Sequence, residues 1–212
     1  MTPYVQSIVD RIENNMSHDE ILDYFGDKCY MAKTTFSEIV EHFIESTNFE
    51  VLYAIFNSLH FKKNAAILDS YNEPIIHSMM YAIYAVVTNS DDTFTPEQRL
   101  EIKEGFVNLI TDETLPFVWN LTDLNIDNPM HLVLTHWECY TKEEVIKILE
   151  LAYENGVNPL NRNDMDCNAF DTLFSYDEFP EEWKNDIMDV LVPMCDDNII
   201  EIEANAYVTA ES

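Results

Sequence analysis

The chain has 212 residues, 47% of them hydrophobic, and carries 40 Asp and Glu against 11 Lys and Arg, a formal net charge of −29. The apolar content is sufficient for a sizeable core and argues against intrinsic disorder. The charge excludes direct binding to nucleic acid and to anionic membranes, because both need a basic surface. The charge indicates instead a basic protein partner, binding of cations, or extreme solubility.

Helix signals follow one another along the first half of the chain. Thr2-Pro3 predicts a helix start, because a capping residue precedes Pro at the first helical position. Capping-box spacing in Ser17-His18-Asp19-Glu20 and in Thr35-Phe36-Ser37-Glu38 predicts two more starts. Apolar stripes or Pro signals predict further helices over residues 51–59, 74–87 and 95–110.

The second half continues this pattern. Thr141-Lys142-Glu143-Glu144 is a third capping box, and its helix is expected to end at Asn155-Gly156. Pro180 begins the last predicted helix. Only Ile199–Ile202, which alternates with Glu201, resembles a strand, and a simple tail is the alternative. The sequence thus predicts an all-α protein with an N-terminal helical region (1–65), helical repeats (66–195) and an acidic C-terminal tail (196–212).

A weak internal repeat lies in the second half of the chain. The segments that begin at Asn128 and Asn168 start 40 residues apart, and each leads into an apolar stretch. Glu73–Ile76 is a more degenerate third candidate. Sequence periods of this size are typical of stacked helix pairs.

Over residues 123–175 the chain resembles the ankyrin repeat family. Asn128-Pro129-Met130-His131 is similar to the Thr-Pro-Leu-His start of that family, and Val145–Gly156 is similar to its second helix and glycine end. Asn161 matches the Asn that follows. The second copy departs from the pattern, with Ala169 and Asp171 in place of Pro and His, and Thr135–Tyr140 lengthens the repeat. The resemblance implies an ankyrin-like stack (an α-solenoid), a structural role for His131 and a protein-binding function; a generic helical domain is the alternative.

The sequence gives little support for a metal site, a cofactor or catalysis. Asp164–Asn168 has the early spacing of a calcium loop but lacks its later Gly and Glu. His131, His136, Cys139 and Cys167 match no standard zinc spacing. Three glycines cannot readily form a phosphate loop, and no nucleophile motif is present. We therefore predict that the protein is not an enzyme and holds no metal or cofactor.

The compartment follows from the cysteines and the hydropathy. Cys29, Cys139, Cys167 and Cys195 show no close pairing, so we expect reduced thiols in a cytoplasmic protein. The N-terminus has no basic segment followed by a long apolar run, so no signal peptide is expected. No stretch approaches 18 apolar residues, which argues against a membrane span.

The candidate binding residues are acidic side chains on predicted helices and nearby aromatic residues. Spacings of three and four place several of the acids on one side of a helix. The acidic candidates are Glu97, Glu101, Glu104, Glu143, Glu144, Glu150, Glu154, Glu181 and Glu182. The aromatic candidates, expected to be exposed, are Trp119, Trp137 and Tyr140.

These residues support three functional hypotheses. The first is a non-enzymatic interaction protein whose acidic surface binds a basic partner. Its narrower form is a DNA-mimic inhibitor, of the kind a virus or phage uses against a host nuclease or defence complex. The second is a conventional ankyrin adaptor that binds through a concave aromatic and apolar face, with acidity serving only solubility. The third is a small enzyme or a cation buffer.

Overall fold

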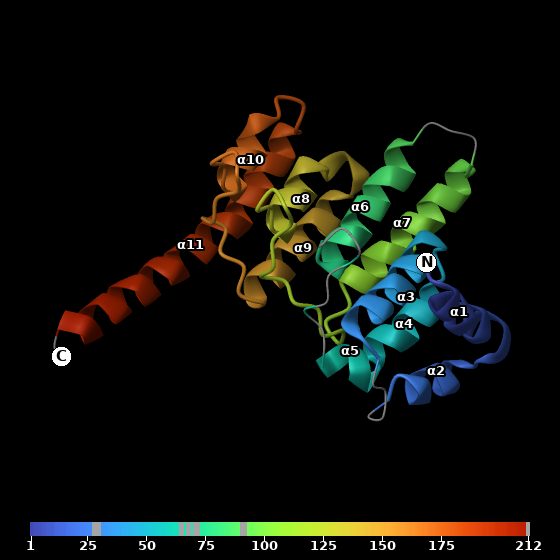
Figure 1. The fold of residues 1–212 in the computed structure, drawn as a ribbon. Helices are drawn as coiled ribbons and strands as arrows, with labels where there is room; N and C mark the ends of the chain where they lie inside the picture. The colour runs from blue at the N-terminus through green and yellow to red at the C-terminus, as the bar shows by residue number, and fades with distance from the viewer. Residues whose placement is uncertain (27–30, 64–65, 67–68, 70–72, 90–92, 211–212) are drawn as a thin grey trace. The chain divides into compact units, whose positions relative to one another are not determined.

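The described part of the chain is all-helical, as the sequence predicts. The computed structural model describes residues 1–26, 31–63, 66, 69, 73–89 and 93–210, with residues 196–210 described by their backbone only. Within these residues the chain forms eleven α-helices and one short 3-10 helix, and no strand (Figure 1). It divides into two compact units, Met1–Leu124 and Asn125–Ser212. The boundary predicted at residue 65 therefore falls inside the first unit.

The described residues of the first unit form seven helices, and most of their starts follow from local capping. Thr2 accepts a hydrogen bond from the Val5 N–H, and Ser17 and Thr95 each form a reciprocal capping box. The start predicted at Thr35 is wrong, because that helix already begins at Lys33 and buries Phe36. The helices are α1 (Pro3–Asn15), α2 (His18–Tyr24), α3 (Lys33–Glu45), α4 (Phe49–Asn57), α5 (Leu59–Lys63), α6 (Ile75–Thr88) and α7 (Pro96–Ile110).

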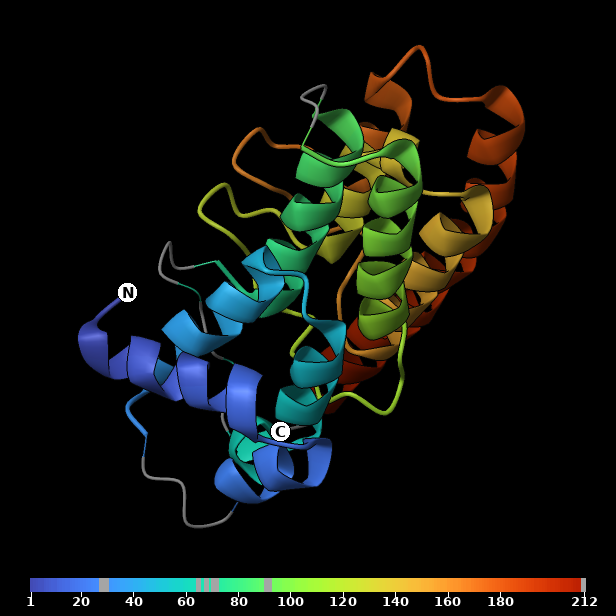
Figure 2. The same ribbon diagram turned by 90° about the vertical axis from the view of Figure 1, so that its right-hand side faces the viewer.

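Aromatic packing explains why the first unit extends past residue 65. The Phe61 ring lies 4.8 Å from Phe56, 6.3 Å from Phe36 and 5.9 Å from Phe117, centroid to centroid. Phe117 follows α7 in the chain and also contacts Phe56 at 5.0 Å in an edge-on arrangement. Such pairs add to the stability that burial of each ring supplies. Helices α6 and α7 pack against each other and lie side by side in both views (Figures 1 and 2).

The second unit begins with a short helix and ends with a long one. Its elements are α8 (Pro129–Thr135), the 3-10 helix η1 (Trp137–Cys139), α9 (Lys142–Glu154), α10 (Ala169–Ser175) and α11 (Glu181–Ala210). The strand-like expectation for Ile199–Ile202 is wrong, because these residues lie within α11. Four alternating residues are too few to distinguish a strand from a helix. The segment predicted as an acidic tail is thus helical through Ala210.

The C-terminus of α9 is fixed by a Schellman motif at the predicted Asn155-Gly156 stop. The Gly156 N–H donates to the Tyr153 carbonyl and the Val157 N–H donates to the Ala152 carbonyl, each at 2.9 Å. Gly156 has a φ of +86°, a value that disfavours residues with a Cβ. Val157 is buried beside this turn.

We expect Gly156→Ala to lower the free energy of unfolding by about 1 kcal/mol. Space around the added methyl is open, so the loss comes from the left-handed backbone alone. Urea denaturation followed by circular dichroism measures it. Glu154→Ala, at an exposed helical position, is the control and should change stability by less than about 0.5 kcal/mol. Equal effects of the two variants would contradict the prediction.

Candidate functional site

The predicted acidic residues fall into two sets that belong to different units. Glu97, Glu101 and Glu104 are exposed on α7 of the first unit. The other candidates lie on α9 and α11 of the second unit. The acidic candidates therefore lie on three helices, α7 in the first unit and α9 and α11 in the second.

Three exposed carboxylates share one face of α9. Glu143, Glu150 and Glu154 are exposed, and spacings of seven and four residues return to the same side of a helix. Glu144 differs from them: it is half-buried, and its carboxylate accepts a 2.7 Å hydrogen bond from the Thr141 N–H. Glu144 therefore caps α9, whereas the other three carboxylates face solvent.

The start of α11 adds exposed carboxylates and uses a lysine from α9. Glu181 and Glu182 are exposed. Lys142 lies 3.6 Å from Glu182 and donates a short hydrogen bond to Asp186. The hydrogen bond to Asp186 raises the pKa of Lys142, so this lysine stays charged and bound within the unit.

Charge on the second unit is strongly unbalanced. Residues 125–212 contain 20 Asp and Glu and only 4 Lys and Arg. Besides Lys142, Arg162 lies 3.5 Å from Asp166 and 3.4 Å from Asp171. Lys184 is buried and lies over the Phe174 ring. These three bases are engaged locally, and by number the 20 acids of the unit far exceed its 4 bases.

The aromatic candidates are less accessible than expected. Trp119 is only 4% exposed and Tyr140 only 5%, so the expectation of exposed side chains is wrong for both. Burial also raises the pKa of the Tyr140 hydroxyl far above its usual range. Trp137 is half-buried, as is Trp183, and their ring centroids lie 5.7 Å apart. Trp183, missed as a candidate, follows Pro180 by three residues.

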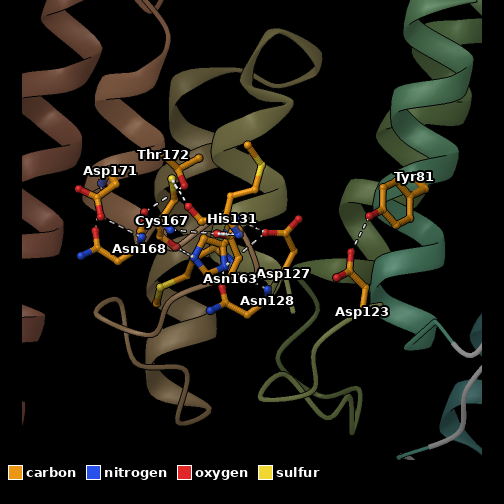
Figure 3. Close-up of polar contacts among 12 residues, drawn as sticks. Tyr81, Asp123, Asp127, Asn128, His131, Asn163, Cys167, Asn168, Asp171 and Thr172 are labelled. Atoms are coloured by element: carbon orange, nitrogen blue, oxygen red, sulfur yellow. Dashed lines mark hydrogen bonds and ion pairs between the residues drawn. The ribbon is translucent and has the colours of Figure 1, made fainter. Parts of the chain in front are cut away.

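Two turns of the second unit share the same local structure (Figure 3). Ile126 and Asp166, 40 residues apart, both adopt a left-handed backbone, with φ of +61° and +62°. Two residues later, Asn128 and Asn168 each cap a seven-residue helix through a capping box. The 40-residue spacing of the sequence thus corresponds to a repeated turn and helix start.

Backbone and side-chain hydrogen bonds join the two turns. The Asp164 N–H donates to the Asn125 carbonyl at 3.0 Å, and the Asn163 amide donates to Asp127 at 2.8 Å. His131 Nδ1 accepts from the Asn128 N–H at 3.1 Å, so Nε2 carries the proton and donates to the Cys167 carbonyl at 3.1 Å. Both ring nitrogens of His131 are thus engaged in hydrogen bonds, one that caps α8 and one that joins the two turns.

A different cluster with ligating groups lies in the first unit and was missed from the sequence. One ligand atom from each of Glu73, His77 and Asp123 lies within 4.8 Å of the other two. His77 is fully buried and Asp123 is 7% exposed. The four-residue spacing of Glu73 and His77 is a weak sequence signal for a shared site. Asp123 lies 46 residues beyond His77, and no sequence pattern links it to the other two residues.

No protein-family model matches the chain, and no curated protein or solved structure matches it. Among the described residues, no helix is both long enough and apolar enough to cross a membrane. Cys139, Cys167 and Cys195 form no disulfide in the described chain, and Cys29 lies outside the described residues.

The paired turns give a matched test of their caps. Asn128 is 3% exposed and its side-chain oxygen accepts from the N–H groups of both Met130 and His131, whereas the side-chain oxygen of half-buried Asn168 accepts from the Asp171 N–H. We expect Asn128→Ala to cost about 2 kcal/mol of unfolding free energy and Asn168→Ala about 1 kcal/mol. Urea denaturation of both variants checks this order, and a larger loss in Asn168→Ala would contradict it.

Proposed function

We propose that this chain is a non-enzymatic interaction protein whose second unit binds a basic protein through its acidic surface. The observation that carries the proposal is the excess of 20 acids over 4 bases on that unit, together with the local engagement of Lys142, Arg162 and Lys184. Uncompensated charge opposes folding through self-repulsion. Binding of a basic partner would relieve that repulsion.

We propose further that the second unit is an ankyrin-like repeat pair. Its support is the repeated turn with Asn128 and Asn168 at the same position, and the hydrogen bonds that join one turn to the next. Stacked repeats hold side chains on rigid helices. Carboxylates held in this way bind at a smaller entropic cost than carboxylates on a loose segment.

The narrower proposal is a DNA-mimic inhibitor of a nucleic-acid-binding or defence protein. Glu143, Glu150 and Glu154 present negative charge along one side of α9, at intervals of about 10 Å and about 6 Å along the helix axis. A basic protein surface that binds DNA phosphates would also bind this row of carboxylates, and that binding would weaken as the salt concentration increases. The proposal places the protein in the cytoplasm, where its thiols stay reduced.

The first experiment is affinity capture from a nuclease-treated lysate, with washes at low and high salt. The triple variant Glu143→Gln, Glu150→Gln and Glu154→Gln should reduce capture of a basic partner about tenfold, since three exposed charges that each contribute about 0.5 kcal/mol together account for the roughly 1.4 kcal/mol of a tenfold change. Short duplex DNA should compete with the wild-type chain if the narrower proposal holds. The captured proteins are identified and quantified by mass spectrometry.

The matched control changes the same number of charges on the other unit. Glu97→Gln, Glu101→Gln and Glu104→Gln on α7 should leave capture unchanged within about twofold. Binding that survives high salt and ignores the α9 substitutions would sink the acidic-surface proposal. Salt-sensitive capture that depends on α7 and not on α9 would move the binding surface to the first unit.

A conventional adaptor is the second candidate, favoured by the half-exposed aromatic pair. Trp137 packs against Phe179 at 4.7 Å and against Trp183 at 5.7 Å. In an adaptor these rings would contribute the anchor that aromatic side chains supply at many interfaces.

If the adaptor hypothesis holds, Trp183→Ala should weaken salt-resistant capture by at least about tenfold, because it removes an interface anchor. The α9 triple variant should leave that capture unchanged. Circular dichroism controls for loss of helix, since Trp183 also contacts Trp137. Full retention of capture by a folded Trp183→Ala chain would count against this candidate.

A further inference from the structure

Glu73, His77 and Asp123 come together in the first unit from distant parts of the chain. Glu73 precedes α6, His77 lies in the first turn of α6, and Asp123 follows α7 near the end of the unit. One ligand atom of each lies within 4.8 Å of the other two. An imidazole and two carboxylates thus share a small and largely buried volume.

The cluster is rich in negative charge. Asp69 adds a third carboxylate, which accepts hydrogen bonds from the Glu73 N–H and the Ser78 hydroxyl, each at 2.9 Å. Glu73 Oε2 is buried and has no hydrogen-bond partner among the residues that the structure describes. Like charges held this close repel one another, and a cation in the cluster would offset that repulsion.

Tyr81 holds one of the carboxylates in place. Its hydroxyl donates a 2.7 Å hydrogen bond to Asp123 Oδ2 (Figure 3). A carboxylate has further lone pairs, so this bond leaves acceptor capacity on Asp123. Hydrogen bonds of this kind orient metal ligands and tune their affinity.

We propose that Glu73, His77 and Asp123 form a binding site for a divalent transition-metal ion of the Zn²⁺ type. The imidazole argues against Mg²⁺ and Ca²⁺, which prefer oxygen ligands alone. Three protein ligands leave a fourth position for water or a second ligand. The three ligand atoms lie within 4.8 Å of one another, whereas the ligands of one Zn²⁺ ion lie about 2.0–2.2 Å from the metal. Small side-chain rotations would bring all three atoms to that distance from a single ion. The site is independent of the proposed binding of a basic partner.

The experiment is isothermal titration of the full-length, chelator-treated protein with Zn²⁺. We expect one equivalent to bind and, at 100 times the dissociation constant, the melting temperature to rise by about 5–10 °C. Glu73→Gln should weaken this binding at least about 100-fold, and Tyr81→Phe about 10-fold to 100-fold through Asp123. Glu73→Gln suits the test because it keeps the side-chain shape and removes a charge from a mutually repelling group, so the metal-free variant should fold.

Two controls separate this site from other zinc-binding groups. Glu104→Gln removes one exposed charge from the same unit and should keep the single site intact. Co²⁺ bound to the wild-type chain should lack thiolate-to-metal charge-transfer absorption, because the proposed ligands include no cysteine. The inference is overturned if the wild type binds no stoichiometric Zn²⁺, if Glu73→Gln binds as tightly as wild type, or if thiolate absorption appears. It is also overturned if Glu104→Gln loses the site, since the binding would then depend on general charge.

Discussion

Electrostatic repulsion among 40 carboxylates is the constraint that the rest of this structure must satisfy. Several acids offset it by acting as caps at helix N-termini, where the helix dipole favours negative charge. Glu20 accepts from the Ser17 N–H, Glu144 from the Thr141 N–H, and Asp171 from the Asn168 N–H. Hydrogen bonds to Ser17 lower the pKa of Glu20, as expected for a stabilised carboxylate. Some of the carboxylates therefore stabilise helix starts. We propose that a basic partner or a cation binds others.

The sequence predicted local features well because they depend on neighbours in the chain. The starts at Thr2 and Ser17 and the Schellman stop at Gly156 each follow from a few adjacent residues. Thr35 was a false capping box, because a helix that begins at Lys33 already includes it. A short motif predicts a cap only when no earlier residue has already started the helix.

Features that depend on contacts distant in sequence could not be predicted in this way. The Phe61 contacts with Phe36 and Phe117 extend the first unit to Leu124, and no local pattern marks that boundary. The burial of Tyr140 is a second case, since this residue was expected to be exposed as a candidate binding residue. The proximity of Glu73 and Asp123 is a third. In each case tertiary packing places residues that periodicity and spacing leave undetermined.

The two proposed uses of negative charge differ physically, because one is exposed and the other is buried. At physiological ionic strength salt largely screens the interaction between surface charges that lie more than about 8–10 Å apart, so the α9 carboxylates would give an attraction that depends on ionic strength. The Glu73, His77 and Asp123 cluster is largely buried, and salt screens buried charges much less than exposed ones. Salt therefore separates the two functions: high ionic strength should release a basic partner from the second unit and leave a metal ion bound to the first.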